Sequence, residues 1–256
     1  MSKLIGIMGC GWLGKPLAVQ LLKQNFEVKG TTTRISKLEE LRDAGIDPYV
    51  VDLGETYIDG GIEAFLEGLE VLVVNIPPGL RSSPQSDYAG RIQLLVRNIE
   101  AYSSIKQLIY VSTTSVFEDQ LDIPVYHEDA IPNAQDSKGK KLIAAEKVIQ
   151  KANANTTIIR PGGLIGGKRH PIKILAGRNN VSNPAAPVNM TDRDYLIDVI
   201  SSVIVGDLHA PIIHAISEPH ESRESYYTKM ADTFNVEAPT FDEGNSAGKK
   251  VVSTIL

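Results

Sequence analysis

Residues 4–14 read Leu-Ile-Gly-Ile-Met-Gly-Cys-Gly-Trp-Leu-Gly, a short apolar run that ends in three spaced glycines. Leu13, Leu17 and Leu21 follow at the spacing of one face of a helix. A buried strand that ends in a glycine-rich turn and opens a helix is the usual start of a β-α-β unit with parallel strands. This stretch therefore predicts an α/β fold.

The same alternation of short apolar runs and helical patterns continues along most of the chain. Further strands are predicted at 26–30, 49–53, 71–76, 108–112, 156–160 and 211–216. Helices are predicted at 35–41, 62–69, 91–102, 142–151, 191–205 and 221–234. Runs such as Val71–Val74 are apolar throughout, which suits a parallel sheet that is buried on both faces. We expect a Rossmann fold with a doubly wound parallel sheet.

The pattern changes after the sixth strand. Residues 162–187 are rich in Gly, Asn and Pro and show no sustained period, so this stretch is not expected to supply a strand of the core sheet. We expect a Rossmann domain over residues 1–165, rejoined by the strand near 211–216. A small substrate-binding or C-terminal region would occupy residues 166–256.

The spaced glycines form a G-x-G-x-x-G motif, Gly9-Cys10-Gly11-Trp12-Leu13-Gly14. Gly9 would make the tight turn, Gly11 would let the backbone approach a pyrophosphate, and Gly14 would allow close packing of helix and strand. The anion would then lie at the positive end of the helix dipole. Trp12 either packs over the helix start or covers the cofactor, and Cys10 is either a small turn residue or a reactive thiol.

The residues beyond the second predicted strand bear on the choice of dinucleotide. Proteins that prefer NAD usually carry Asp or Glu about 20 residues after the glycines, where it binds the ribose hydroxyls. Here residues 29–34 read Lys-Gly-Thr-Thr-Thr-Arg and contain no acid. Thr32, Thr33 and Arg34 instead suit a 2′-phosphate. We predict NADP, with NAD as the alternative; Arg34 also fits a solvated residue at a helix start.

Two more strand ends are expected at the cofactor crevice, because the carboxyl ends of parallel strands face it. Asp52 and Leu53 close the third strand, where Asp52 could accept from the adenine amino group or serve as a turn residue. Asn75, Ile76 and Pro77 end the fourth strand and would border the second ribose.

Four further segments carry a family resemblance. They are Tyr110-Val-Ser-Thr-Thr-Ser-Val-Phe117, Val125-Tyr-His-Glu128, Arg160-Pro-Gly-Gly-Leu-Ile-Gly166 and Val188-Asn-Met-Thr-Asp-Arg-Asp194. In order and spacing they resemble the extended short-chain dehydrogenase/reductases, the group of NAD-dependent epimerase/dehydratases, and most closely its atypical branch. The resemblance covers nearly the whole chain.

The resemblance implies a site. Thr113 matches the Ser or Thr that orients the substrate oxygen in this group. The backbone at the end of the sixth strand would flank the nicotinamide, through Arg160, Pro161, Gly162 and Gly163.

The group's catalytic Tyr and Lys, four residues apart on the helix after the fifth strand, are missing. Aligning on Ala144-Ala145-Glu146 puts Lys138 at the Tyr position and Leu142 at the Lys position. A one-residue slip brings Ser137 and Lys141 there instead. Tyr126 or His127 could replace the acid or could lie on the loop surface, and residues 168–170, Lys-Arg-His, could bind an anionic group or form a solvated turn.

Composition limits the partners. Of 256 residues, 26 are basic and 31 acidic, well mixed along the chain with a net charge of −5, which argues against binding nucleic acid or an anionic membrane. No apolar run is long enough for a membrane span and no signal peptide is evident, so we expect a cytoplasmic protein. The single cysteine excludes an internal disulfide, and no metal site is expected.

These features favour an NADP-binding oxidoreductase or epimerase/dehydratase-like enzyme with a non-standard active site. Its substrate would be a small molecule, such as a nucleotide sugar or another carbonyl or alcohol, and the protein would be a monomer or homodimer. The alternative is a non-catalytic NADP(H)-binding sensor or regulatory module, because the Tyr and Lys are lost.

Overall fold

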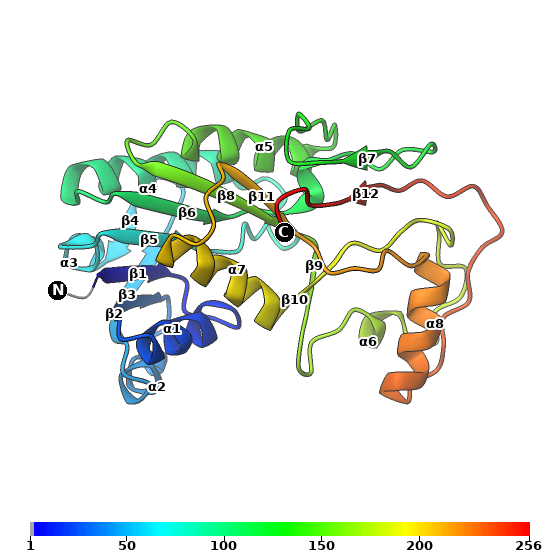
Figure 1. Ribbon diagram of the computed structural model, residues 1–256, viewed down its shortest axis with the longest axis horizontal. Helices are drawn as coiled ribbons and strands as arrows, with labels where there is room; N and C mark the ends of the chain where they lie inside the picture. The colour runs from blue at the N-terminus through cyan, green and yellow to red at the C-terminus, as the bar shows by residue number, and fades with distance from the viewer. Residues whose placement is uncertain (1–2) are drawn as a thin grey trace. The chain divides into compact units, whose positions relative to one another are not determined.

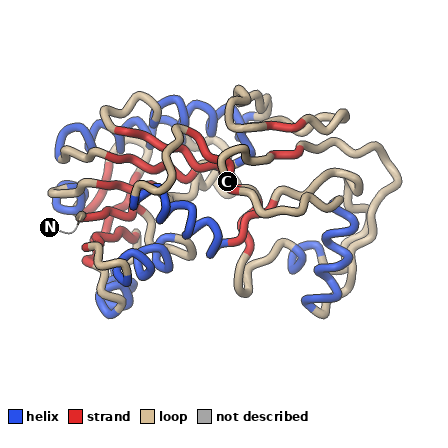
Figure 2. The backbone as a smooth tube through the Cα atoms, in the orientation of Figure 1, coloured by secondary structure: helices blue, strands red, loops and turns tan. Residues whose placement is uncertain are grey.

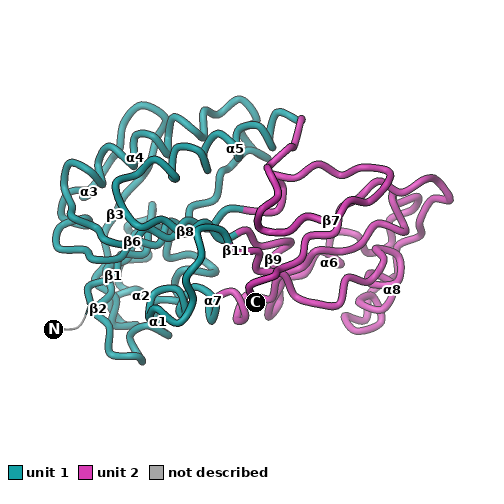
Figure 3. Tube along the Cα trace, turned by 45° about the horizontal axis from the view of Figure 1, so that its top comes forward, with its two compact units in different colours: residues 1–112, 136–159, 197–212 teal, residues 113–135, 160–196, 213–256 magenta. Residues whose placement is uncertain are grey.

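The computed structural model describes residues 3–256, which form two compact units (Figure 3). Unit 1 comprises the residues up to 112 together with 136–159 and 197–212. Unit 2 comprises residues 113–135, 160–196 and 213–256. The chain therefore passes between the units several times. Among the described residues, no helix is both long and apolar enough to cross a membrane.

The main sheet has eight strands in the order β11-β8-β6-β5-β1-β2-β3-β4. Their bounds are β1 Leu4–Met8, β2 Glu27–Thr32, β3 Asp47–Leu53, β4 Ile58–Gly60, β5 Val71–Val74, β6 Gln107–Val111, β8 Asn155–Pro161 and β11 Ile212–Ala215. β1 pairs in parallel with both β2 and β5, so the strand order reverses beside β1. This is the doubly wound arrangement that the sequence predicts, and the predicted fold class is confirmed.

Helices cover both faces of this sheet (Figure 1). They are α1 Gly14–Lys23, α2 Leu38–Asp43 after the short 3-10 turn η1 Ile35–Lys37, α3 Ile62–Leu66, α4 Tyr88–Tyr102, α5 Ser137–Ile149 and α7 Arg193–Val205. α4 and α5 lie on one face, and α1 and α7 lie on the other. The burial of β5 on both sides explains why all four of its residues are apolar.

Two elements of unit 1 depart from the prediction. β4 was not predicted, because three residues carry too little periodic signal; it pairs antiparallel with β3 at the edge of the sheet. α5 begins at Ser137, five residues before the predicted Leu142. The Asp136 side chain accepts a hydrogen bond from the Gly139 amide and caps this helix, a local signal that precedes the apolar stripe.

Unit 2 contains short elements joined by long loops (Figure 2). They are η2 Thr114–Val116, β7 Val125–Tyr126, β9 Gly163–Ile165, α6 Ile172–Leu175, β10 Met190–Asp192, α8 Arg223–Phe234 and β12 Lys250–Val251. β9 pairs with β10 and β7 pairs with β12, each in a separate two-stranded parallel sheet. The Gly- and Pro-rich stretch thus contributes a strand, but not to the main sheet.

His170 belongs to the hydrophobic core of unit 2. Its Nε2 lies 2.9 Å from the Tyr226 hydroxyl, and its Nδ1 accepts from the Ile172 amide. Its ring stacks on Phe234 at 4.9 Å between centroids. Because Nδ1 accepts and burial lowers its pKa, with the Lys173 charge adding to the effect, the ring is neutral. His170 is therefore neither a solvated turn residue nor an anion-binding cation; Lys168 and Arg169 beside it are exposed.

A second buried network in unit 2 surrounds Glu128. Its carboxylate accepts hydrogen bonds from the Ser253 hydroxyl (2.5 Å), from the Thr254 amide and hydroxyl (3.0 and 2.9 Å) and from the His214 amide (3.2 Å). Burial by itself raises the pKa of Glu128, but these hydrogen bonds together lower it to about 2. The ionised carboxylate therefore ties the C-terminal segment to β11.

We expect Glu128→Gln to reduce stability in a pH-dependent way. The folded pKa of about 2 lies below the usual 4.5, so the ionised carboxylate stabilises the fold above about pH 4.5, and this contribution is lost as the pH falls towards 2. The variant should lose about 2 kcal/mol of unfolding free energy at pH 7 and should show a shallower acid decline. Denaturant unfolding from pH 2 to 7 measures this. Glu243→Gln, at an exposed position of the same unit, is the control; an equal loss there would contradict the assignment.

Candidate functional site

The glycine turn follows β1, and hydrogen bonds connect the backbone of residues 8–10 to Thr31 of β2 and to Asn75 after β5. The Gly9 amide donates to Oγ1 of Thr31 at 2.9 Å, and the Cys10 amide donates to the Thr31 carbonyl oxygen at 2.8 Å. The amide of Asn75 donates to the Met8 carbonyl oxygen at 2.9 Å. Gly9 has φ +104°, a backbone conformation that residues with a Cβ rarely adopt. The tight turn therefore needs glycine at this position.

Gly11 and Gly14 differ in what surrounds them. A Cβ on Gly14 would collide with the Gly9 carbonyl oxygen, so Gly14 allows α1 to approach the turn closely. A Cβ on Gly11 would meet no atom of the described residues within 4 Å, its two chain neighbours excepted. The backbone at Gly11 thus borders open space at the start of α1, which is where a pyrophosphate would bind. Packing alone does not require a glycine there, so this turn fits a dinucleotide.

Cys10 lies inside the turn and points away from this space. Its Sγ is 3.8 Å from the Ile7 carbonyl oxygen, and a Cβ on Gly30 of β2 would collide with Sγ. Burial raises the pKa of the thiol to about 12, although the backbone hydrogen bond with Thr31 opposes the shift. Cys10 is therefore a packing residue of the turn and not a reactive thiol.

We expect Cys10 to resist alkylation in the folded protein. With a pKa of about 12, the thiolate is scarce at pH 8, so iodoacetamide should react at least about a hundredfold more slowly than with the unfolded chain. Mass spectrometry after timed alkylation, with and without denaturant, measures both rates. Similar rates in the two states would show that the thiol is accessible and would refute the packing role.

The threonines after β2 divide into two roles. Thr31 is buried, and its hydroxyl is occupied by the Gly9 amide, so it serves the turn. Thr32 is half-buried, and its Oγ1 accepts from the Arg34 amide at 3.3 Å. Thr33 and Arg34 are exposed just before η1. Thr32, Thr33 and Arg34 therefore form a polar rim at the carboxyl end of β2.

Basic residues surround this rim. Lys15 of α1 and Lys37 of η1 both hydrogen-bond to the carboxylate of Glu40. These two hydrogen bonds, that of Lys15 first, lower the pKa of Glu40 to about 2. Together with Arg34, Lys15 and Lys37 bring three positive charges to the elements beside the glycine turn. The Glu40 carboxylate pairs with the two lysines.

The remaining predicted dinucleotide contacts of unit 1 lie at neighbouring strand ends. Asp52 is exposed on β3, opposite Asp59 of β4. Leu53 is buried, and its carbonyl oxygen accepts from Nε of Arg91 at 2.9 Å. Asn75, which follows β5, places its Nδ2 3.4 Å from the Gly9 carbonyl oxygen. Ile76 is half-buried and Pro77 is exposed.

The residue that follows β6, Ser112, pairs with an acid of α5 whose role the sequence did not reveal. Ser112 donates its hydroxyl hydrogen to Oε1 of Glu146 at 2.6 Å, and Glu146 is buried. Glu146 lies on α5 one turn after Leu142, on the stripe that includes Leu142 and Ile149. A charged residue on a buried stripe was the signal that could have revealed it, because such residues are almost always paired.

Thr113, the predicted catalytic residue, opens η2. Its Oγ1 accepts from the Ser115 amide at 3.2 Å and donates to the Ser115 hydroxyl oxygen at 3.3 Å. The side chain is half-buried. Thr113 therefore has a structural role as the cap of this turn, and its hydroxyl keeps further hydrogen-bonding capacity.

Neither alignment of α5 provides a Tyr and a Lys for catalysis. Leu142 is buried in the core, while Lys138 is half-buried and Ser137 is exposed. Lys141 donates to the carbonyl oxygens of Pro84 (2.6 Å) and Ser86 (2.8 Å), in the loop before α4. Lys141 thus fastens that loop to α5.

Of the two proposed substitutes for the acid, Tyr126 is a packing residue. Its ring stacks on Phe117 at 4.4 Å and is buried. Its hydroxyl donates to the Glu118 carbonyl oxygen and accepts from Nδ2 of Asn133. The interpretation of Tyr126 as a loop-surface residue is wrong, and its hydroxyl is occupied by groups of the protein. His127 is exposed.

The segment after β8 is held inside unit 2. The Arg160 guanidinium is buried over the Phe117 ring, 5.1 Å from its centroid, and lies 3.4 Å from Nε2 of His214. The Gly162 amide donates to Oγ1 of Thr191 at 2.8 Å, and the Gly163 amide donates to the Asn189 carbonyl oxygen at 2.8 Å. Pro161 is buried between them. The Arg160 side chain and the amides of Gly162 and Gly163 thus contact the protein itself.

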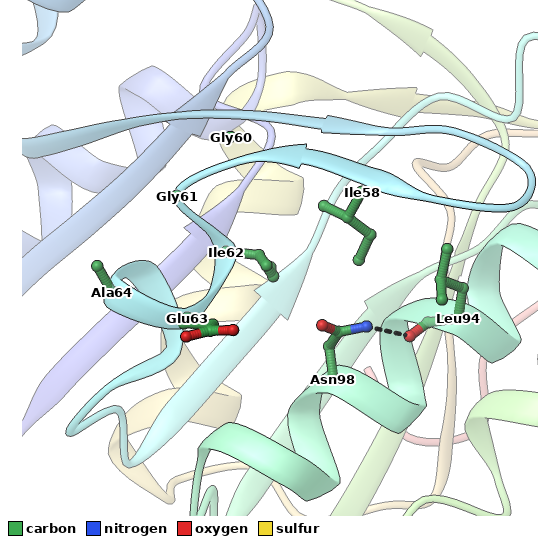
Figure 4. A pocket seen from close by; sticks show the side chains of 8 residues that line it. All are labelled: Ile58, Gly60, Gly61, Ile62, Glu63, Ala64, Leu94 and Asn98. Atoms are coloured by element: carbon green, nitrogen blue, oxygen red, sulfur yellow. Dashed lines mark hydrogen bonds between the residues drawn. The ribbon is translucent and has the colours of Figure 1, made fainter.

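A cavity of about 590 Å³ in unit 1 includes none of the predicted site residues (Figure 4). It lies among β4, α3 and α4 and is lined by Ile58, Glu63, Leu94 and Asn98, among others. Nδ2 of Asn98 is occupied by the Leu94 carbonyl oxygen. Within residues 3–256, no cluster of three His, Cys, Asp or Glu side chains could hold a metal ion.

Comparison with known proteins agrees with this geometry. The model of a family described as NAD(P)H-binding matches residues 9–194, which begin at the first glycine of the turn. Protein YeeZ of Escherichia coli strain K12 is 28% identical over 251 residues, which cover 96% of this chain and 89% of YeeZ.

Similar solved structures include two epimerases from Bacillus cereus. UDP-glucuronic acid 4-epimerase in complex with NAD has a TM-score of 0.74 at 14% identity, over 98% of this chain and 88% of that one. UDP-N-acetylglucosamine 4-epimerase has a TM-score of 0.74 at 15% identity, over 97% and 87%. A short-chain dehydrogenase/reductase superfamily protein from Agrobacterium tumefaciens with bound NAD has a TM-score of 0.71 at 13% identity, over 97% and 88%. The resemblance predicted from the sequence is confirmed in the fold.

Proposed function

The chain belongs to the NAD(P)H-binding family, and from this premise we propose that it binds NADP(H) at the glycine turn of unit 1 and acts as an oxidoreductase or epimerase/dehydratase-like enzyme. The open space beside Gly11 is the observation that carries the proposal. Packing does not explain a glycine at a position where a Cβ would meet open space, whereas the close approach of a pyrophosphate does. The bound nicotinamide would supply reversible hydride transfer.

The polar rim supports NADP over NAD. No acid stands among residues 29–34 to bind an unsubstituted ribose, and Arg34 is exposed where a 2′-phosphate would lie. Thr32 and Thr33 would add hydroxyl donors to the phosphate oxygens. Lys15 and Lys37 make the surroundings basic even though both bind Glu40.

On the substrate side, we infer that Thr113 orients a carbonyl or hydroxyl oxygen of a small molecule. Ser112 donates its only hydroxyl hydrogen to Glu146 and can then only accept from a ligand. The Thr113 hydroxyl donates to the Ser115 hydroxyl oxygen at 3.3 Å, a long hydrogen bond that a ligand oxygen could replace. By the family resemblance, the backbone from Arg160 to Gly163 would flank the nicotinamide. The substrate belongs to the alcohols and carbonyl compounds, for which nucleotide sugars are the first class to test.

We expect wild-type protein to bind NADPH more tightly than NADH, and Arg34→Ala to remove that preference. A guanidinium–phosphate hydrogen bond is worth about 1.5–3 kcal/mol, so NADPH affinity should fall roughly tenfold to a hundredfold while NADH affinity is unchanged. Titration calorimetry at constant salt measures both affinities. Arg42→Ala, at an exposed position of α2, is the matched control. A wild-type preference for NADH, or an equal loss for both cofactors, would refute the NADP assignment.

A second candidate function is a non-catalytic NADP(H)-binding module. Two observations on α5 favour it: Leu142 is buried, and Lys141 donates hydrogen bonds to the loop before α4. These residues leave α5 without the expected acid and base. NADPH oxidation assayed over carbonyl compounds and nucleotide sugars distinguishes the two. Turnover would establish the enzyme, whereas inactivity towards all of them by protein that binds NADPH tightly would favour the module.

A further inference from the structure

The Glu40 carboxylate bridges two ammonium groups in unit 1. Nζ of Lys15 donates to Oε1 at 2.7 Å, and Nζ of Lys37 donates to Oε2. The three residues belong to three different elements, because Lys15 lies on α1, Lys37 on η1 and Glu40 on α2. Each oxygen of one carboxylate therefore holds a different lysine, and the bridge gathers two positive charges around a single anion.

This bridge lies beside the proposed dinucleotide site. Lys15 directly follows Gly14, and its amide donates to the Gly11 carbonyl oxygen at 3.1 Å. The Lys37 amide donates to the Arg34 carbonyl oxygen at 3.0 Å. One lysine is thus anchored to the glycine turn and the other to the polar rim, where the proposed function puts the pyrophosphate and the 2′-phosphate.

All three charged groups are accessible from solvent. The exposed fractions of the side chains are 42% for Glu40, 31% for Lys15 and 40% for Lys37. The two hydrogen bonds hold the pKa of Glu40 at about 2, so the carboxylate is ionised at pH 7. Exposed ion pairs of this kind contribute little to folding stability. A ligand can therefore reach the two lysines and replace the carboxylate without disturbing the fold.

A phosphate monoester has the chemistry to make that exchange. It carries up to two negative charges and three acceptor oxygens, and it forms charge-assisted hydrogen bonds with ammonium groups, as a carboxylate does. An ionised Glu40 would repel the phosphate while it stays between the lysines. The two anions therefore exclude each other from the same pair of cations.

We propose that the Glu40 carboxylate competes with the 2′-phosphate of NADP(H) for Lys15 and Lys37, and thereby limits the preference of the protein for NADP(H) over NAD(H). When the phosphate binds, it takes over the two ammonium groups and the Glu40 side chain moves into the solvent. NAD(H) carries an uncharged hydroxyl at that position and leaves the bridge intact. The inference rests on the proposed function, because it requires the dinucleotide at the glycine turn.

Glu40→Gln tests the competition, because it removes the charge and keeps the size of the side chain. We expect the variant to bind NADPH about threefold to tenfold more tightly than wild type and to bind NADH with unchanged affinity. Titration calorimetry on the full chain at constant salt measures both affinities. Glu39→Gln, at the preceding exposed position of α2, changes the net charge by the same amount and should alter neither affinity.

Lys37→Gln tests the cation side of the same exchange. It should weaken NADPH binding about tenfold, the effect of losing one charge-assisted hydrogen bond, and should leave NADH affinity unchanged. Adding Glu40→Gln to this variant should give a smaller gain in NADPH affinity than it gives in wild type, because one of the two contested lysines is gone.

Several outcomes would overturn the inference. An equal gain for NADPH and NADH in Glu40→Gln, or the same gain in Glu39→Gln, would show a general effect of charge. A loss of NADH affinity in Glu40→Gln would mean that the carboxylate binds the ribose hydroxyls. Wild-type protein that binds neither dinucleotide would refute the proposed function and this inference with it. Tight NADPH binding that neither Glu40→Gln nor Lys37→Gln changes would refute this inference alone.

Discussion

Gly11→Ala should abolish NADP(H) binding while leaving the fold intact. Apart from the two chain neighbours of Gly11, no atom of residues 3–256 lies within 4 Å of the new Cβ, so the folded chain has no clash to relieve. Gly11 has no positive φ that would strain an alanine. The methyl group would instead occupy the volume through which the pyrophosphate approaches the backbone, and it would hold the phosphates away from the start of α1. We expect at least about a hundredfold loss of affinity, or about 3 kcal/mol.

Two measurements on the same sample check this result. Titration calorimetry with NADPH gives the affinity, and thermal unfolding without cofactor should give a melting temperature close to that of wild type. Gly244→Ala is the matched control, because it adds a Cβ with ordinary contacts at an exposed position of unit 2. Unchanged NADPH affinity in Gly11→Ala would place the cofactor elsewhere and would remove the basis of the proposed function.

Gly9→Ala, two residues earlier, should act mainly on the fold: we expect it to lower the free energy of unfolding of the protein. At φ +104° an alanine is strained by about 1–3 kcal/mol. Its Cβ would also collide with the backbone carbonyl oxygen of Asn75, which cannot move aside as a flexible side chain could. Overpacking of this kind costs about 1–3 kcal/mol more. We therefore expect a total loss of about 3 kcal/mol or more in unfolding free energy.

Denaturant unfolding of Gly9→Ala without cofactor measures that loss, and Gly11→Ala is its control within the same turn. Because the collision displaces the β5 end, the variant should also bind NADPH more weakly, but only as a consequence of the altered turn. If Gly9→Ala unfolded with the same free energy as Gly11→Ala, the positive φ assigned to Gly9 and its close contact with Asn75 would be refuted.

The fold was predictable because its signals are local. A strand, a glycine turn and a helix occupy residues 4–23, and each is encoded by neighbours in sequence. Continuous apolar runs such as Val71–Val74 then indicate a sheet buried on both faces. Where the signal is shorter, prediction failed: β4 and the small sheets of unit 2 have two or three residues per strand, and distant pairing stabilises them more than periodicity does.

The roles of individual polar residues were less predictable. Thr31 and Thr32 look equivalent in the sequence, but Thr31 is buried and holds the Gly9 amide whereas Thr32 lies on the rim. His170 looks like part of a basic turn but lies in an aromatic core. Tyr126 looks available as an acid but is stacked and hydrogen-bonded. In each case residues distant in sequence set the burial.

By itself the sequence determined the glycine turn, the parallel α/β architecture and the absence of an acid at residues 29–34, because turn conformation, strand burial and side-chain charge are properties of short segments. Only the tertiary structure decided that Gly11 borders open space while Gly14 is packed, that Glu146 holds Ser112, and that Nε2 of His220 has no hydrogen-bond partner among residues 3–256. These depend on which atoms from distant segments meet, and on how much water they exclude, and no local pattern encodes that.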